Sequence, residues 1–217
     1  ILGGGVAAAI SAGFNAPLAG IMFAHEAVLR HFSMKAIAPI AIASGTAFAV
    51  HNYFWGASTP FVQLDLASEI GPMILISIAA GPFFGLIALL FMSSILMFSS
   101  LPQRMGLSNF QAFLIAITGL SVIGSFYPEA IGLGTITIVN LTTESPLLLV
   151  ALAILIAKII ATSLSLGFGF FGGVFSPALL VGAAAGSVAT AVVNWTGLHS
   201  FQGPELIICG MAAVAGS

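Results

Sequence analysis

The chain of 217 residues is 59% hydrophobic and 5% charged, with a formal net charge of −2 and a mean hydropathy of +1.19. Soluble domains carry about 25% charged residues, so this composition excludes a water-soluble globular protein. It also offers no basic patch for nucleic acid, no intrachain disulfide because Cys209 is the single cysteine, and no histidine spacing typical of zinc. We therefore expect no metal, no cofactor and no nucleic-acid partner.

Apolar runs divide the chain into segments, and most of them are long enough to cross about 30 Å of hydrocarbon. The first run covers residues 1–29, as one segment or as two short ones broken at Asn15–Pro17. The later runs are 36–50, 71–98, 110–126, 146–165 and 174–193. This pattern predicts an all-α, multi-pass integral membrane protein, in contact with a lipid bilayer of the plasma or bacterial inner membrane.

Small residues recur four positions apart in three of these runs. The pairs are Ala9 with Gly13, Gly81 with Gly85, and Gly182 with Gly186. Such spacing lets two helix backbones approach closely in lipid, where no hydrophobic force drives helices together. We interpret all three pairs as helix-packing contacts.

Three stretches, 12–20, 127–146 and 167–186, interrupt the apolar pattern with proline, glycine or asparagine. Irregular backbone at membrane depth survives only inside protein or along a water-filled path. Many transporters build ion sites from helices broken in this way. We therefore predict discontinuous helices at these three places.

The stretch 167–186, GFGFFGGVFSPALLVGAAAG, places four glycines directly before a helix whose first turn contains Pro177. A helix N-terminus presents backbone N–H groups and a partial positive charge, which together can hold an anion. No lysine or arginine occurs in 159–217, so such a site would use peptide dipoles. The alternative is that the glycines mark only a helix–helix contact and a helix start.

Two motifs in this chain resemble those of the CLC family of chloride channels and chloride/proton antiporters. The sequence GGVFSP at 172–177 is similar to the family's G-x-F-x-P motif, and FNAPLAGIMFAHE at 14–26 is similar to its N-A-P-L-x-G stretch and glutamate. The resemblance covers the whole chain in order. It implies a transmembrane domain of two inverted repeats with tilted, partial helices, assembled as a homodimer with one pore per subunit.

The resemblance also implies how this chain maps onto the pore. The end of the first repeat would cover about 1–56, and most of the second about 70–217. Chloride would be held by the backbone N–H groups of Val174 and Phe175. The surrounding turn would consist of Gly172, Gly173, Ser176 and Pro177. The family's other anion ligands, in G-S-G-I-P and G-x-E-G-P motifs and at a late tyrosine, would precede Ile1 or follow Ser217, so we expect this chain to be part of a longer protein.

The residue after Glu26 bears on whether transport is coupled to protons. Antiporters of the CLC family, which this chain resembles, commonly have a second glutamate directly after the first, and that glutamate relays protons. This chain has Ala27 at that position. We therefore predict passive, channel-like conduction, with a proton-coupled antiporter as the alternative. His25 could serve as the proton relay or be a packed histidine, since one residue turns the side chain by about 100° on a helix.

Glu26 and Lys158 are ionisable residues within apolar segments, where charges are costly and usually paired or placed in a wet cavity. Lys158 could extend its ammonium to the membrane interface, and Glu26 could pair with the basic connection at 30–35. The other hypothesis is a direct Glu26–Lys158 pair. An enzyme is not expected, because the chain lacks a metal-ligand pair, a Cys/His dyad and paired carboxylates on one helix. A membrane scaffold without substrate is the alternative of another class.

Overall fold

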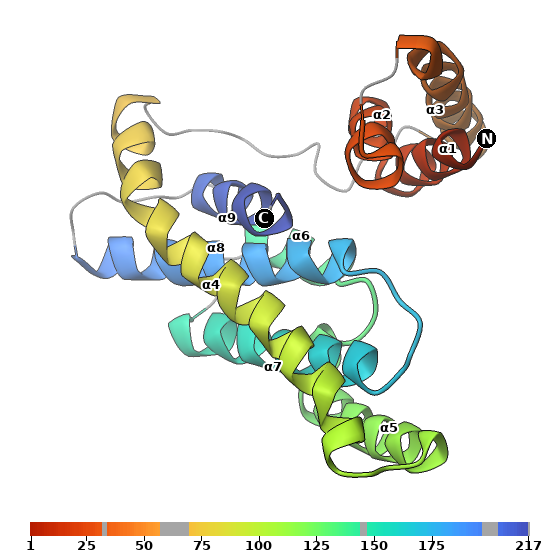
Figure 1. The fold of residues 1–217 in the computed structure, drawn as a ribbon. Helices are drawn as coiled ribbons and strands as arrows, with labels where there is room; N and C mark the ends of the chain where they lie inside the picture. The colour runs from red at the N-terminus through yellow and green to blue at the C-terminus, as the bar shows by residue number, and fades with distance from the viewer. Residues whose placement is uncertain (32–33, 57–69, 144–146, 197–203, 217) are drawn as a thin grey trace. The chain divides into compact units, whose positions relative to one another are not determined.

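The computed structural model describes residues 1–31, 34–56, 70–143, 147–196 and 204–216. Within these ranges every regular element is helical, which confirms the all-α prediction. The chain divides into two compact units, Ile1–Gln63 and Leu64–Ser217 (Figure 1). The predicted division into the end of one repeat (about 1–56) and most of a second (about 70–217), related by inversion, stays a prediction.

The first unit contains two short helices, a π-helical turn and one long helix. These are α1 (Leu2–Phe14), α2 (Pro17–Phe23), the π-helix η1 (Ala24–Leu29) and α3 (Met34–Trp55). The chain breaks where it was predicted to, because Asn15 adopts a left-handed φ of 52° that ends α1, and Pro17 then opens α2. The first apolar run is therefore two short segments.

Helix α1 packs on α2 and α3 through small residues. Its buried positions, four residues apart, are Gly3, Ala7 and Ser11. The hydroxyl of Ser11 donates to the carbonyl of Ser44 at 2.7 Å, and the hydroxyl of Ser44 donates to the carbonyl of Pro17 at 2.8 Å. The packing contact predicted for Ala9 and Gly13 is not formed within this unit, because Ala9 is exposed and a Cβ on Gly13 would meet no atom within 4 Å.

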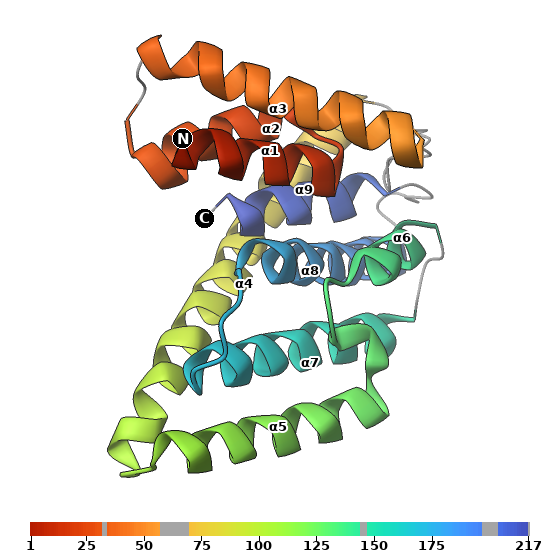
Figure 2. The same cartoon turned by 90° about the vertical axis from the view of Figure 1, so that its right-hand side faces the viewer.

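The second unit is a stack of helices crossed by one very long helix. Its elements are α4 (Ile70–Arg104), α5 (Asn109–Phe126), the 3₁₀ turn η2 (Pro128–Ala130), α6 (Thr135–Thr143), α7 (Leu148–Gly167), α8 (Phe175–Thr196) and α9 (Glu205–Ala215). Figure 2 shows α9, α8, α7 and α5 one below another, with α4 crossing the first three before it connects to α5. At 35 residues, α4 is about 50 Å long, so it must tilt strongly to fit a bilayer.

Five of the described helices are long and apolar enough to cross a membrane. They are Met34–Trp55, Met73–Arg104, Asn109–Phe126, Leu148–Gly167 and Phe175–Trp195. The apolar helices Leu2–Phe14, Pro17–Leu29 and Glu205–Ala215 are shorter. Long and short helices together match the predicted discontinuous membrane architecture.

The glycine pair of α8 forms a very close helix contact in the second unit. A Cβ on Gly182 would collide with the backbone of Gly210, and a Cβ on Gly186 with that of Ile207, so α8 and α9 touch along their main chains. This confirms the packing role predicted for that pair. The same prediction is wrong within this unit for Gly81 and Gly85, because a Cβ there would meet nothing within 4 Å.

Candidate functional site

The glycine-rich stretch before α8 is an irregular turn that leads into a helix N-terminus. Helix α7 ends at Gly167, and Gly169 takes a φ of +96°, which a residue with a Cβ rarely adopts. Residues 170–173 form no regular element, and α8 begins at Phe175 with Pro177 in its first turn. The predicted broken backbone and helix start are therefore confirmed.

The turn is fixed at both of its ends. Near its start, the ring of Phe170 stacks on Phe113 of α5, with centroids 5.2 Å apart and an interplanar angle of 14°. At the helix start, the hydroxyl of Ser176 donates to the carbonyl of Leu133 at 2.7 Å. The first turn of α8 is thereby held by the segment between η2 and α6.

The segment between η2 and α6 also holds the ammonium group of a lysine of the same chain. Gly132 and Gly134 have φ angles of +73° and +76°, so the backbone reverses here at little steric cost. The ammonium of Lys158 donates to the carbonyls of Ala130 at 2.9 Å and of Gly132 at 2.7 Å. One short segment therefore joins Lys158 on α7 to Ser176 at the start of α8.

Lys158 is 3% exposed and points into the second unit. The prediction that Lys158 extends its ammonium to the membrane interface is therefore wrong, because two backbone carbonyls hold the ammonium inside the protein. Glu26 belongs to the other compact unit, where its side chain is exposed. A pair between these two residues stays a prediction.

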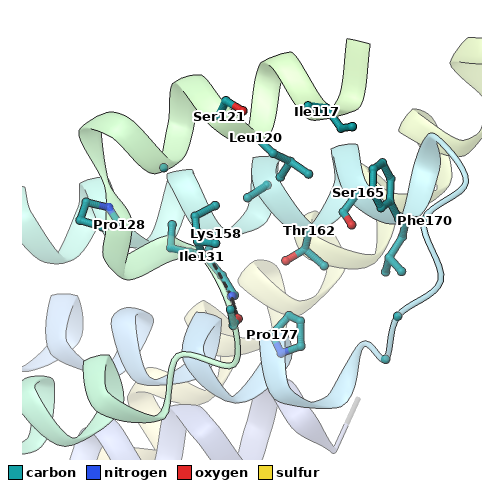
Figure 3. A pocket seen from close by; sticks show the side chains of 17 residues that line it. Ile117, Leu120, Ser121, Pro128, Ile131, Lys158, Thr162, Ser165, Phe170 and Pro177 are labelled. Carbon is teal, nitrogen blue, oxygen red and sulfur yellow. Dashed lines mark hydrogen bonds between the residues drawn. The ribbon is translucent and has the colours of Figure 1, made fainter. Parts of the chain in front are cut away.

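A pocket of about 870 Å³ lies between α5, α7 and the turn that leads to α8. Its lining includes Lys158, Gly172, Gly173 and Pro177, which the sequence had singled out separately. Figure 3 shows Lys158 and Thr162 on one side of this pocket and Pro177 close by. Val174, Phe175 and Ser176 follow in the same turn but are not part of the lining. Their role as chloride ligands stays a prediction.

The lining includes polar residues that the sequence analysis missed. Besides Lys158, the lining includes three residues with hydroxyl groups, Thr162 and Ser165 of α7 and Ser121 of α5. Lys158, Thr162 and Ser165 follow the i, i+4, i+7 spacing of one helix face. A polar stripe at that spacing in an apolar helix was the signal that could have identified them.

The first unit places His25 and Glu26 in different environments. His25 is 1% exposed, and its Nδ1 lies 2.9 Å from the carbonyl oxygen of Ile21, whereas Glu26 and Ala27 are exposed. All three lie in the π-helix η1, a geometry often found at functional sites and not expected from the sequence. The structure therefore favours the packed interpretation of His25.

Among the residues that the structure describes, no three His, Cys, Asp or Glu side chains come together in a way that could hold a metal ion. The charged side chain in the lining of the pocket is Lys158, a cation, and Pro177 of the first turn of α8 lies in the same lining.

Comparison with known proteins identifies the kind of protein that carries this arrangement. A family model described as voltage gated chloride channel matches residues 1–217. The chain is 31% identical over 186 residues to the voltage-gated ClC-type chloride channel ClcB of Escherichia coli O17:K52:H18, covering 84% of this chain and 44% of that protein. It is 30% identical over 226 residues to the H(+)/Cl(−) exchange transporter ClcA of Salmonella agona, covering 99% of this chain and 47% of that protein.

A more distant relative comes from a plant. The chloride channel protein CLC-f of Arabidopsis thaliana is 28% identical over 212 residues, covering 88% of this chain and 27% of that protein. The chain thus spans about half the length of the bacterial relatives that it matches. These relatives bear the names of channels and of an exchanger.

Proposed function

The chain belongs to the voltage-gated chloride channel family, and from this premise we propose that it forms part of a chloride pathway through a membrane. It is an integral multi-pass membrane protein with helices of spanning length. We propose chloride as the transported ion, and a homodimer with one pathway in each subunit as the assembly.

The observation that carries this proposal is the turn at the start of α8. Gly172 and Gly173 open into the pocket, and a Cβ on Gly173 would meet nothing within 4 Å, so the main chain is accessible there. The following N–H groups, those of Val174 and Phe175, are the proposed chloride ligands. Peptide dipoles bind an anion without a fixed charge in the turn, which suits an ion that must also leave.

Passive conduction is the proposed mode of transport. The position after Glu26 holds Ala27, which has no proton to exchange, and both residues are exposed within the first unit. One observation supports the alternative, a proton-coupled antiporter. His25 is buried in a π-helical turn directly beside Glu26, and an imidazole can both donate and accept a proton.

The substitution Gly173→Val separates transport from a scaffold without substrate. A valine side chain at 173 extends into the pocket and meets no protein atom close to its Cβ. We expect the intact protein to assemble normally in detergent and to lose most of its chloride flux in liposomes. Gly85→Val is the matched control, since a Cβ at position 85 of α4 also meets open space, away from the pocket. Flux equal to wild type in both variants would contradict a role of the turn at 172–177 in the pathway, and absence of chloride flux from the folded wild-type protein would favour the scaffold.

A further inference from the structure

We propose that the pocket beside Lys158 is a second binding site for a small inorganic anion, separate from the backbone site at 174–175. The inference rests on the proposed chloride pathway and adds a fixed cation to it. Lys158 then acts as an anion ligand, with the hydroxyl of Thr162 as its neighbour on α7.

The charge balance around Lys158 is the first argument. The residue is 3% exposed, and both hydrogen bonds of its ammonium go to neutral carbonyls, those of Ala130 and Gly132. Within the part of the chain that the structure describes, no carboxylate forms an ion pair with it. A buried charge of this kind is costly unless an opposite charge lies close. A mobile anion in the pocket supplies that charge.

The remaining hydrogen-bonding capacity of the ammonium is the second argument. A lysine ammonium has three N–H donors, and the two carbonyls use two of them. The carbonyls fix the ammonium at the wall of the pocket, so the third donor is positioned for a ligand there. Thr162, one turn further along α7, places a hydroxyl in the same pocket as a second donor (Figure 3).

The shape of the pocket is the third argument. Its volume of about 870 Å³ is many times the roughly 30 Å³ of one water molecule, so an anion can enter with part of its hydration shell. The same pocket is lined by Gly172, Gly173 and Pro177, at the approach to the proposed backbone site. An anion attracted by Lys158 is therefore already at the entrance to the turn.

Bromide in crystals of the intact protein tests the site directly, because its anomalous scattering locates the ion. We expect one peak in the pocket within hydrogen-bonding distance of the Lys158 ammonium and another at the N–H groups of 174–175. A peak at 174–175 alone overturns the Lys158 site and leaves the chloride pathway intact. Absence of both peaks, together with absence of chloride flux, overturns the pathway as well. The wild-type crystal decides the question even if substitutions at 158 prevent folding.

Flux measured against chloride concentration gives the functional test. Lys158→Met removes the charge, and we expect the chloride concentration for half-maximal flux to rise at least tenfold. Lys158→Arg keeps the positive charge and the N–H donors, so the chloride concentration for half-maximal flux should change less than threefold. Lys35→Met is the control, because it removes one exposed positive charge elsewhere in the chain. If the Met and Arg variants at 158 both transport like wild type, Lys158 only stabilises the 130–132 segment and the proposal is wrong.

Discussion

Replacement of Gly186 by alanine tests the close contact between α8 and α9. A Cβ at this position would lie 2.5 Å from the carbonyl oxygen of Leu206 and 2.8 Å from the amide nitrogen of Ile207. Both are backbone atoms, which a change of rotamer cannot move aside. Since carbon atoms pack best at roughly 3.5–4.0 Å from their neighbours, α9 would have to shift outward by about 1 Å.

The expected loss of stability follows from two opposing terms. Overpacking of a tight contact costs about 1–3 kcal/mol, while replacing glycine by alanine inside a helix contributes about 1 kcal/mol in favour of folding. Gly85→Ala shares the second term only, because its Cβ meets nothing within 4 Å. The difference between the two variants, about 1–3 kcal/mol, therefore isolates the contact between α8 and α9.

Thermal unfolding of the intact protein in detergent measures this difference. A domain of 150–250 residues changes its Tm by about 2–4 °C for each kcal/mol, and a longer protein changes it by less. We expect Gly186→Ala to unfold at a lower temperature than Gly85→Ala. Identical Tm values for the two variants would refute the close approach of α8 and α9, and with it the position of the helix that begins at the proposed anion site.

Three further predictions concern the turn at the start of α8. Ser176→Ala loses the hydrogen bond to the carbonyl of Leu133, worth about 0.5–1.5 kcal/mol, so we expect half-maximal flux to need a higher chloride concentration. Ser94→Ala is the control, because it loses only a hydrogen bond within its own helix and should leave that concentration unchanged. Phe170→Ala should lower the free energy of unfolding, and a double-mutant cycle with Phe113→Ala should give a coupling of about 0.5–1.5 kcal/mol; zero coupling contradicts the stacked pair. Val174→Ala should keep chloride flux, because the proposed ligand is the backbone N–H, whereas Val174→Pro removes that N–H and should reduce flux; equal loss in both variants contradicts a backbone ligand.

Local sequence signals predicted the breaks in the fold. Asn15 and Pro17 end one helix and begin the next because each restricts its own backbone, so the break is visible without tertiary structure. The start of α8 was predictable for the same reason, from Pro177 and the glycines before it. The π-helix η1 was not, because no residue type within it marks the change in hydrogen bonding.

Glycine spacing predicts the capacity for close packing and not the contact itself. The pairs Gly81–Gly85 and Gly182–Gly186 have the same spacing, yet only the second meets another backbone in the structure. Which face of a helix is covered depends on elements distant in sequence, here α9 on α8. A single sequence carries no record of that pairing.

The pocket shows the same limit at the level of a site. Lys158 was singled out as a costly charge, but its partners are main-chain carbonyls of Ala130 and Gly132, which every residue type possesses. The sequence therefore could not indicate where the ammonium points. The folded chain brings Lys158 and the glycines at 172–173 to one pocket although they were predicted as separate features.

The most direct test of the central claim is chloride efflux from liposomes containing the intact protein, recorded together with proton movement under an imposed chloride gradient at zero voltage. We predict chloride flux without proton transport, as expected for a passive pathway with Ala27 after Glu26. Uphill proton movement at a fixed ratio to chloride would instead establish the antiporter and direct attention to His25. Absence of anion flux from well-folded protein would contradict the chloride pathway itself.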